Sequence, residues 1–340
     1  TSVSAKEGAV IEMPVTKEDQ AKAAAVVKKL ETKVDEYRTE KWGVLALVGV
    51  DKSLSKIDDN TRSNFMPYGL SGIMLGASIV FFAYIGFDAI STHSEEAKNP
   101  SRDLPIGILA SLILCTILYI GVAATITGMV PYPDINTHAA VSEAFIERAA
   151  TDKTPLLNVA GALIATGALA GLTSVLLITF LSQARIFLAM ARDGLLPPRI
   201  FASIHPKFRT PHISTMLTGG IIAVVSAFTP IEDLELMVNI GTLAAFVVVC
   251  AAVLLLRIQR PDAHRPFRCP LVFVVAPLGI VVNLIMMLFL PPITWLRLII
   301  WLAAGLVIYF CYGYWRSTVG RRMRGLEVEH IDIPNLGHGH

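Results

Sequence analysis

Long runs of apolar residues alternate with shorter polar segments along most of this chain. We count seven such runs from residue 70 onwards, each near or above the roughly 20 residues that an α-helix needs to cross about 30 Å of hydrocarbon. This pattern predicts an all-α polytopic membrane protein with seven transmembrane helices. The predicted spans cover residues 70–92, 105–130, 155–182, 211–230, 234–256, 270–290 and 293–315.

Two polar segments flank this apolar region. Residues 1–69 form a polar N-terminal segment, in which residues 16–41 have the pattern of a surface helix that starts near Thr16. The apolar run 42–50 is too short to span a membrane, and we interpret it as the end of a lost or damaged helix. Residues 316–340 form a basic tail.

The composition supports the membrane assignment. Hydrophobic residues make up 54% of the chain, charged residues only 16%, and the mean hydropathy is +0.59. A soluble protein of this length needs a much larger share of polar surface.

The positive charges are distributed unevenly between the two sides of the predicted membrane region. The segments 93–104, 183–210 and 257–269 and the tail together carry fifteen Lys and Arg residues, whereas the loops on the other side carry only Arg148 and Lys153. The positive-inside rule therefore places the C-terminus in the cytoplasm of a multi-pass protein of the cell (plasma or inner) membrane. The basic tail is a candidate for contact with anionic lipid, and no aromatic interleaving supports a nucleic-acid site.

The first span contains an unusual stretch at mid-depth, FFAYIGFD (Phe81–Asp88). One reading is a helix that breaks at Gly86 and leaves backbone carbonyls free to accept hydrogen bonds from an ammonium group, with Phe82, Tyr84 and Phe87 forming an apolar wall. The other is an ordinary helix with aromatic packing. The sequence does not decide between them.

Asp88 is the mid-span carboxylate in this stretch, and it is a candidate proton carrier or a cap for backbone amides of a second half-helix. Thr173 and Ser174 in the third span are candidates for bridging to a substrate or cation, or for bonding to their own helix.

The sequence predicts neither a metal site nor a cofactor. His93, Glu95 and Glu96 follow the first span, but adjacent glutamates at a helix end are typical of a solvated or ion-paired position. The four cysteines show no CxxC spacing, and three of them lie in predicted spans.

Several motifs resemble the amino acid–polyamine–organocation (APC) permeases, in particular their cationic amino acid transporter branch. The run from Phe81 to Ile108 is similar to the family's sixth helix and following loop. Further resemblances follow in the family's order, and together they cover about residues 65–320. They are SQARIFLAMARDGLLPP (182–198), HPKFRTPHIST (205–215), NIGTLAAFVVV (239–249) and RPDAHRPFRCP (260–270).

The resemblance implies the LeuT-type fold of two inverted repeats, with these seven spans as helices six to twelve. Helices one to five would then be missing partners of this chain, an odd number that also moves the N-terminus of the full protein to the cytoplasm. The resemblance places the substrate at Phe82, Ala83, Tyr84, Ile85, Gly86 and Phe87. In it, the carbonyls of Phe82, Ala83 and Ile85 accept from the substrate's α-ammonium, and Phe87 acts as part of a gate.

We therefore expect transmembrane transport of an L-amino acid by alternating access, as proton-coupled symport or exchange, with the fragment alone inactive. The alternative is a transporter of the same fold that carries a polyamine or another organic cation. An intramembrane enzyme is a remote alternative, because the spans lack paired catalytic groups.

Overall fold

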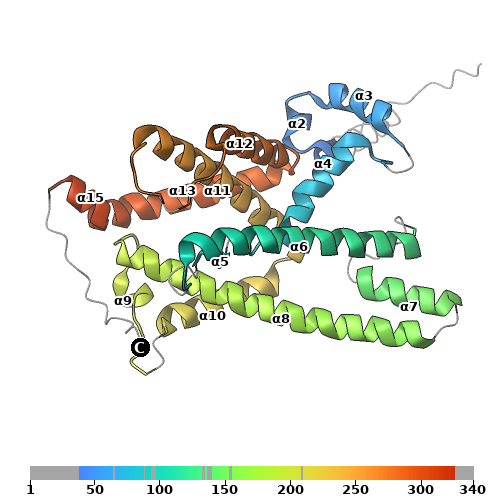
Figure 1. Cartoon of the computed structure of the whole chain (residues 1–340), viewed down its shortest axis with the longest axis horizontal. Helices are drawn as coiled ribbons and strands as arrows, with labels where there is room; N and C mark the ends of the chain where they lie inside the picture. Colours follow the sequence, from blue (N-terminus) through green and yellow to red (C-terminus); the bar gives the residue numbers. More distant parts are fainter. Residues whose placement is uncertain are drawn as a thin grey trace, which may run out of the picture.

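The computed structural model describes residues 38–63, 66–87, 89–92, 97–131, 135, 140–152, 155–207, 210–265 and 267–325. All regular structure within these ranges is helical (Figure 1). The first helices are α2 (Val44–Leu47), α3 (Asp51–Thr61), α4 (Gly69–Val80), the 3₁₀ helix η1 (Phe81–Tyr84) and α5 (Ala89–Thr92). Then come α6 (Pro100–Met129), α7 (Ala140–Asp152), α8 (Pro155–Arg192), α9 (Pro198–Phe201) and α10 (His212–Phe228). The last are α11 (Ile231–Gln259), α12 (Val272–Leu288), α13 (Pro292–Ile308), the π-helix η4 (Tyr309–Gly313), α14 (Tyr314–Arg316) and α15 (Thr318–Met323).

The all-α membrane architecture predicted from the sequence is confirmed. Within the described residues, five helical segments are long and apolar enough to cross a membrane, while α10 and α12 have 17 residues each. At 1.5 Å per residue, 17 residues extend about 26 Å, slightly less than the thickness of the hydrocarbon core. The number of seven spans therefore stays a prediction.

Several helices extend past the predicted span limits. α6 begins at Pro100 rather than at 105, and α8 continues to Arg192 instead of ending at 182. Hydropathy marks only the part of a helix that lies in hydrocarbon, and the backbone continues its hydrogen bonding into the polar interface.

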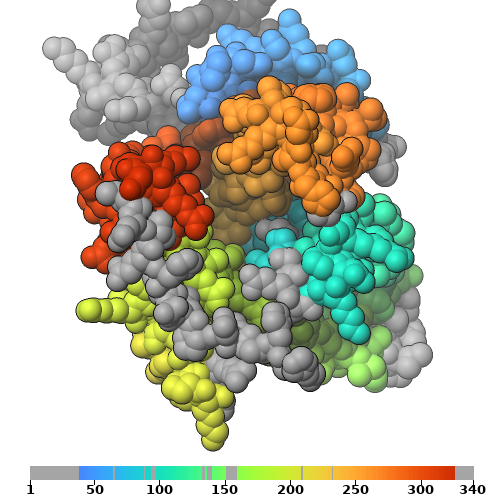
Figure 2. Space-filling view, turned by 60° about the vertical axis from the view of Figure 1, so that its left-hand side comes forward, coloured from blue at the N-terminus to red at the C-terminus, as the bar shows by residue number. Residues whose placement is uncertain are grey.

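The helices pack in two groups. In the first group, α11 packs along α12 and α13. In the second group, α7 packs along α8, and α5 contacts both α6 and α8 (Figure 1). α4 contacts α11 and α12. Figure 2 shows the orange and red atoms of the chain after residue 250 on one side, and the teal to yellow atoms of the α6–α10 part on the other.

One buried core cluster lies in the group formed by α11, α12 and α13. Ile240 and Leu243 of α11 are fully buried against Met287 and Leu290, and Phe81 of η1 packs against this cluster. Away from this cluster, apolar side chains are widely exposed in both groups, as at Ile113 (61%) on α6 and Trp301 (64%) on α13. Faces of this kind are stable against lipid or another apolar protein surface.

The N-terminal segment holds more structure than its polar sequence suggests. Of the predicted surface helix 16–41, only residues 38–41 lie within the described part, and they are helical. The apolar run 42–50 contains the short helix α2, where Trp42 and Ala46 pack against Phe289. It is followed by α3, a helix that the sequence analysis did not predict, which packs against α4.

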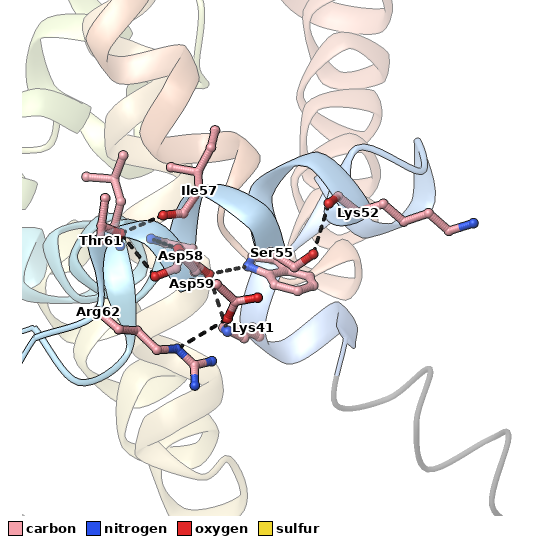
Figure 3. A network of polar contacts seen from close by, with 11 residues as sticks. Lys41, Lys52, Ser55, Ile57, Asp58, Asp59, Thr61 and Arg62 are labelled. Atoms are coloured by element: carbon pink, nitrogen blue, oxygen red, sulfur yellow. Dashed lines mark hydrogen bonds and ion pairs between the residues drawn. The ribbon is translucent and has the colours of Figure 1, made fainter.

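A buried carboxylate joins α3 to the first turn of α4 (Figure 3). Asp58 is 1% exposed and accepts hydrogen bonds from the Ser71 backbone amide at 2.9 Å, from the Ser71 hydroxyl and from the Trp42 indole at 3.3 Å. Lys41 Nζ lies 3.3 Å from its Oδ2. The carboxylate thereby satisfies an amide that has no partner within α4 and places negative charge at the positive end of that helix.

The close approach of α3 to α4 depends on a glycine. Gly69 has a φ of +69°, and a Cβ at this position would lie 2.8 Å from Asp58 Cα and Cβ. A side chain here would strain the backbone and push α3 away from α4.

The environment of Asp58 changes its acidity. Burial by itself raises the pKa of Asp58, but the hydrogen bonds from Ser71 and Lys41 outweigh it, so that the pKa lies below its usual value. A lowered folded-state pKa means that the carboxylate stabilises the fold fully above its unfolded-state pKa. This contribution is lost as the pH falls below about 4 and through the folded-state value.

We predict that Asp58→Asn lowers the free energy of unfolding by about 2–3 kcal/mol at pH 7, because Lys41 and Ser71 lose a charged partner. The variant should also lose part of the acid sensitivity of the parent protein. Thermal unfolding in detergent micelles at pH 7 and pH 3 measures both effects.

Asp59→Asn is the matched control. Asp59 lies next in the chain, is 69% exposed and is paired with Arg62 at 3.7 Å. Its replacement should change the stability by no more than about 0.5 kcal/mol. Equal effects of the two variants would show that Asp58 does not hold α3 to α4.

Candidate functional site at a broken helix

The first span breaks in its middle, at Gly86. α4 gives way to the 3₁₀ helix η1 at Phe81, Ile85 is extended (φ −61°, ψ 130°) and Gly86 has a φ of +121°. The helix resumes at Ala89 as α5. Of the two readings left open by the sequence, the structure supports the broken helix.

Gly86 is required by the backbone conformation and not by crowding. A Cβ at Gly86 would meet no atom within 4 Å, but its φ lies in a region that residues with a side chain rarely adopt. The sequence thus places its glycine where the chain must turn.

The break frees backbone carbonyls, and neighbouring groups satisfy some of them. The Phe82 carbonyl accepts from the Ile85 amide at 3.1 Å, and the Ala83 carbonyl accepts from the Tyr119 hydroxyl at 2.9 Å. No hydrogen bond to the Ile85 carbonyl is found among the described residues. Because each carbonyl oxygen has two lone pairs, all three can accept a further donor.

Aromatic rings surround the break. The rings of Phe81 and Phe87, from either side of it, contact Phe246 of α11 with centroid distances of 6.0 and 5.5 Å. Tyr84 stacks edge-to-face on Tyr119 of α6 at 5.2 Å, and its hydroxyl donates to Thr116 Oγ1 at 3.2 Å. Phe82, Ala83 and Gly86 are exposed.

Phe246 and Tyr119 were not predicted from the sequence. Phe246 belongs to the NIGTLAAF stretch that carries part of the family resemblance, and this was the signal that could have identified it. Tyr119 carries no comparable signal, because it lies within a long apolar run.

The two halves of the broken helix belong to different groups of helices. α4 and η1 contact α11, and α4 also contacts α12. α5 contacts α6 and α8, and the Thr92 hydroxyl lies 3.3 Å from that of Ser182 on α8. The break therefore lies at the junction of the two groups.

Thr173 and Ser174 lie on α8 and not in the stretch around the break. The Thr173 hydroxyl donates to the Leu169 carbonyl of its own helix at 2.8 Å, and both Thr173 and Ser174 are exposed on α8. No hydrogen bond links them to the FFAYIGF stretch in the part of the chain that the structure describes. Asp88, His93, Glu95 and Glu96 lie outside the described residues. Among the residues that the structure describes, no group of three or more His, Cys, Asp or Glu side chains could hold a metal ion.

Comparison with known proteins places this chain in a family. Residues 43–313 match the family model described as amino acid permease. The chain is 44% identical over 279 residues to the methylthioribose transporter of Bacillus subtilis (strain 168), an alignment that covers 82% of this chain and 58% of that protein.

Two further relatives carry amino acid transporter names. Identity to the branched-chain amino acid permease BcaP of Bacillus subtilis (strain 168) is 42%, over 76% of this chain and 54% of that protein. Identity to the vacuolar cationic amino acid transporter 4 of Arabidopsis thaliana is also 42%, over 59% of this chain and 32% of that protein. The chain thus spans little more than half the length of the bacterial relatives that it matches.

We predict that Gly86→Ala destabilises the fold by about 1–2 kcal/mol, because a side chain opposes the positive φ at the break. Gly76→Ala is the matched control, since Gly76 lies within α4 and a Cβ there also meets no atom within 4 Å. Alanine should favour the helix at Gly76 by about 0.5–1 kcal/mol. Thermal unfolding of both variants in detergent compares them, and a shift of the same sign in both would contradict a requirement for glycine at the break.

Proposed function

Since this chain belongs to the amino acid permease family, we propose that it forms the second half of a transporter that carries an L-amino acid across a membrane by alternating access. The observation that carries this proposal is the broken helix at Gly86, within a span that is otherwise long and apolar. Backbone groups freed at mid-membrane are stable only when protein, water or a ligand satisfies them. A bound ammonium group supplies such donors.

In this proposal the carbonyls of Phe82, Ala83 and Ile85 accept hydrogen bonds from the substrate's α-ammonium. Tyr84, Gly86 and Phe87 line the side-chain region, and Phe87 closes over the substrate as a gate. Two contacts support this arrangement. Phe87 already packs against Phe246 across the break, and Tyr119 shows that a hydroxyl donor can reach the Ala83 carbonyl.

The substrate's carboxylate needs partners that the broken helix does not offer. We propose that helices one to five of the full fold supply them, together with the group that couples transport to protons. The alignments with the bacterial relatives, which cover 58% and 54% of their lengths, agree with this division.

We propose the substrate class from the residues that line the site. Phe87 and Phe246 favour a neutral, apolar side chain, as the name of the branched-chain amino acid permease among the relatives also suggests. An organic cation remains the alternative, because such a substrate needs a carboxylate and Asp88 is the candidate. Symport with protons and exchange of one amino acid for another are both compatible with this site.

We propose that the C-terminus faces the cytoplasm, because the Lys and Arg residues gather on that side. The membrane itself is the cell membrane in this proposal. Some relatives carry vacuolar, chloroplastic or mitochondrial names, which makes localisation of a tagged protein a direct test.

The proposal is tested by uptake into proteoliposomes. The complete reading frame that contains this sequence is expressed, reconstituted and offered a panel of labelled amino acids and polyamines, with and without an inward proton gradient. Saturable uptake of an amino acid supports the proposal, and its dependence on the gradient distinguishes symport from exchange. Uptake of polyamines alone supports the cation alternative, and absence of any uptake by correctly folded protein contradicts both.

We predict that Phe87→Ala raises the half-saturating substrate concentration roughly tenfold, which corresponds to about 1.4 kcal/mol, because the substrate loses an aromatic contact. Phe273→Ala serves as the control, since Phe273 is exposed on α12. The same uptake assay measures both variants. Unchanged saturation in Phe87→Ala would exclude this ring from the substrate site.

A further inference from the structure

A fully buried asparagine of α11 contacts the broken helix just before the break. Asn239 is 0% exposed, and its Nδ2 donates to the Ile79 carbonyl in the last turn of α4 at 3.3 Å. Its Oδ1 is buried and has no hydrogen-bond partner among the described residues. The contact joins residues that are 160 positions apart in the chain.

This arrangement is poorly suited to a purely stabilising role. A buried acceptor without a partner costs free energy, whereas an apolar side chain of similar shape at the same position does not. The donor half of the same amide, however, reaches a backbone carbonyl where α4 changes from α-helical to 3₁₀ geometry. We therefore attribute the role of Asn239 to the hydrogen bond that it donates to the Ile79 carbonyl.

The adjacent residue of α4 is held in the same way. The Ser78 hydroxyl is fully buried and lies 3.0 Å from the Met286 carbonyl of α12 and 2.8 Å from the Met74 carbonyl of its own helix. Polar contacts from both α11 and α12 thus meet α4 at two consecutive residues. They fix the end of α4 from which η1 starts.

The same face of α11 then follows the chain across the break. Asn239, Leu243 and Phe246 are spaced by four and three residues, which places them on one side of the helix. Leu243 is fully buried in the cluster that includes Phe81, and Phe246 contacts both Phe81 and Phe87. Of these three residues, Asn239 is the one that makes a hydrogen bond to the α4 backbone in the described part of the chain, at 3.3 Å to the Ile79 carbonyl.

We propose that Asn239 is a positioning residue for the substrate site. By holding the Ile79 carbonyl, it sets the direction in which η1 leaves α4, and with it the direction in which the carbonyls of Phe82, Ala83 and Ile85 point. The consequence for transport rests on the proposed function, while the effect on the break does not.

The chain offers a matched control for this role. Asn283 of α12 is half-buried, and its Nδ2 donates to the Gly279 carbonyl of its own helix at 2.7 Å. Like Asn239, it is an amide side chain that donates to a backbone carbonyl. Its hydrogen bond, however, stays within one helix and does not connect two helices. Both Asn239→Leu and Asn283→Leu remove an amide side chain. Asn239→Leu also removes a link to the broken helix, whereas Asn283→Leu does not.

The first measurement is hydrogen exchange by mass spectrometry on the chain in lipid nanodiscs. In Asn239→Leu we expect peptides covering 79–92 to exchange roughly fivefold faster, as for the loss of one net hydrogen bond, while peptides of α6 and α8 are unchanged. The melting temperature should stay the same or rise, because the unpaired oxygen is gone. Asn239→Ala, which removes the donor without adding bulk, should give the same local change, and Asn283→Leu should give none.

The second measurement is uptake by the reconstituted complete protein. Asn239→Leu should raise the half-saturating concentration severalfold with little change in the maximal rate, a split that a general loss of stability does not produce. Unchanged exchange at 79–92 in both Asn239 variants, or faster exchange everywhere with a lower melting temperature, would overturn the positioning role. A local exchange effect in a protein whose parent form takes up no substrate would overturn the proposed function and support the role at the break.

Discussion

The hydrocarbon core of a membrane offers no hydrogen bonds to a protein backbone, and this constraint governs the structure around Gly86. A continuous helix meets it by internal hydrogen bonding. A broken helix must find other partners for the groups that it releases, and here these come from neighbouring helices. Tyr119 of α6 donates to the Ala83 carbonyl, and Asn239 of α11 donates to the Ile79 carbonyl. The break thus depends on side chains far away in the sequence.

The same constraint explains which parts of the fold could be predicted. Each of the seven apolar runs forms helix over most of its described residues, because helix is the simplest way to satisfy a backbone in lipid, and the break falls at the glycine that the sequence singled out. Helix lengths were harder to predict, because the apolar run marks only the part of a helix expected in hydrocarbon. The predicted span ended at residue 182, whereas α8 continues to Arg192. Helix α3 has a polar sequence, and its formation is tied to tertiary contacts of Asp58.

The partners of the break could not be derived from the pattern of residues. Tyr119, Asn239 and Phe246 lie in apolar runs where each has an ordinary packing interpretation. The fold brings Asn239 to the end of α4, and Tyr119 and Phe246 to η1. Thr173 and Ser174 illustrate the opposite case. The sequence left two interpretations open for them, a contact with substrate or a bond to their own helix, and the Thr173 hydroxyl donates to the Leu169 carbonyl of its own helix.

The cap that Asp58 provides for α4 has a consequence for the order in which the protein is made. Asp58 and Ser71 are 13 residues apart, whereas the contact of Ser78 with Met286 joins residues 208 positions apart. Because a ribosome releases the chain from its N-terminus, α3 is already synthesised when α4 enters the translocon. The Ser71 amide, which has no acceptor within α4, therefore has a partner before α11 and α12 exist. The remaining contacts of α4 form only after most of the chain has been translated.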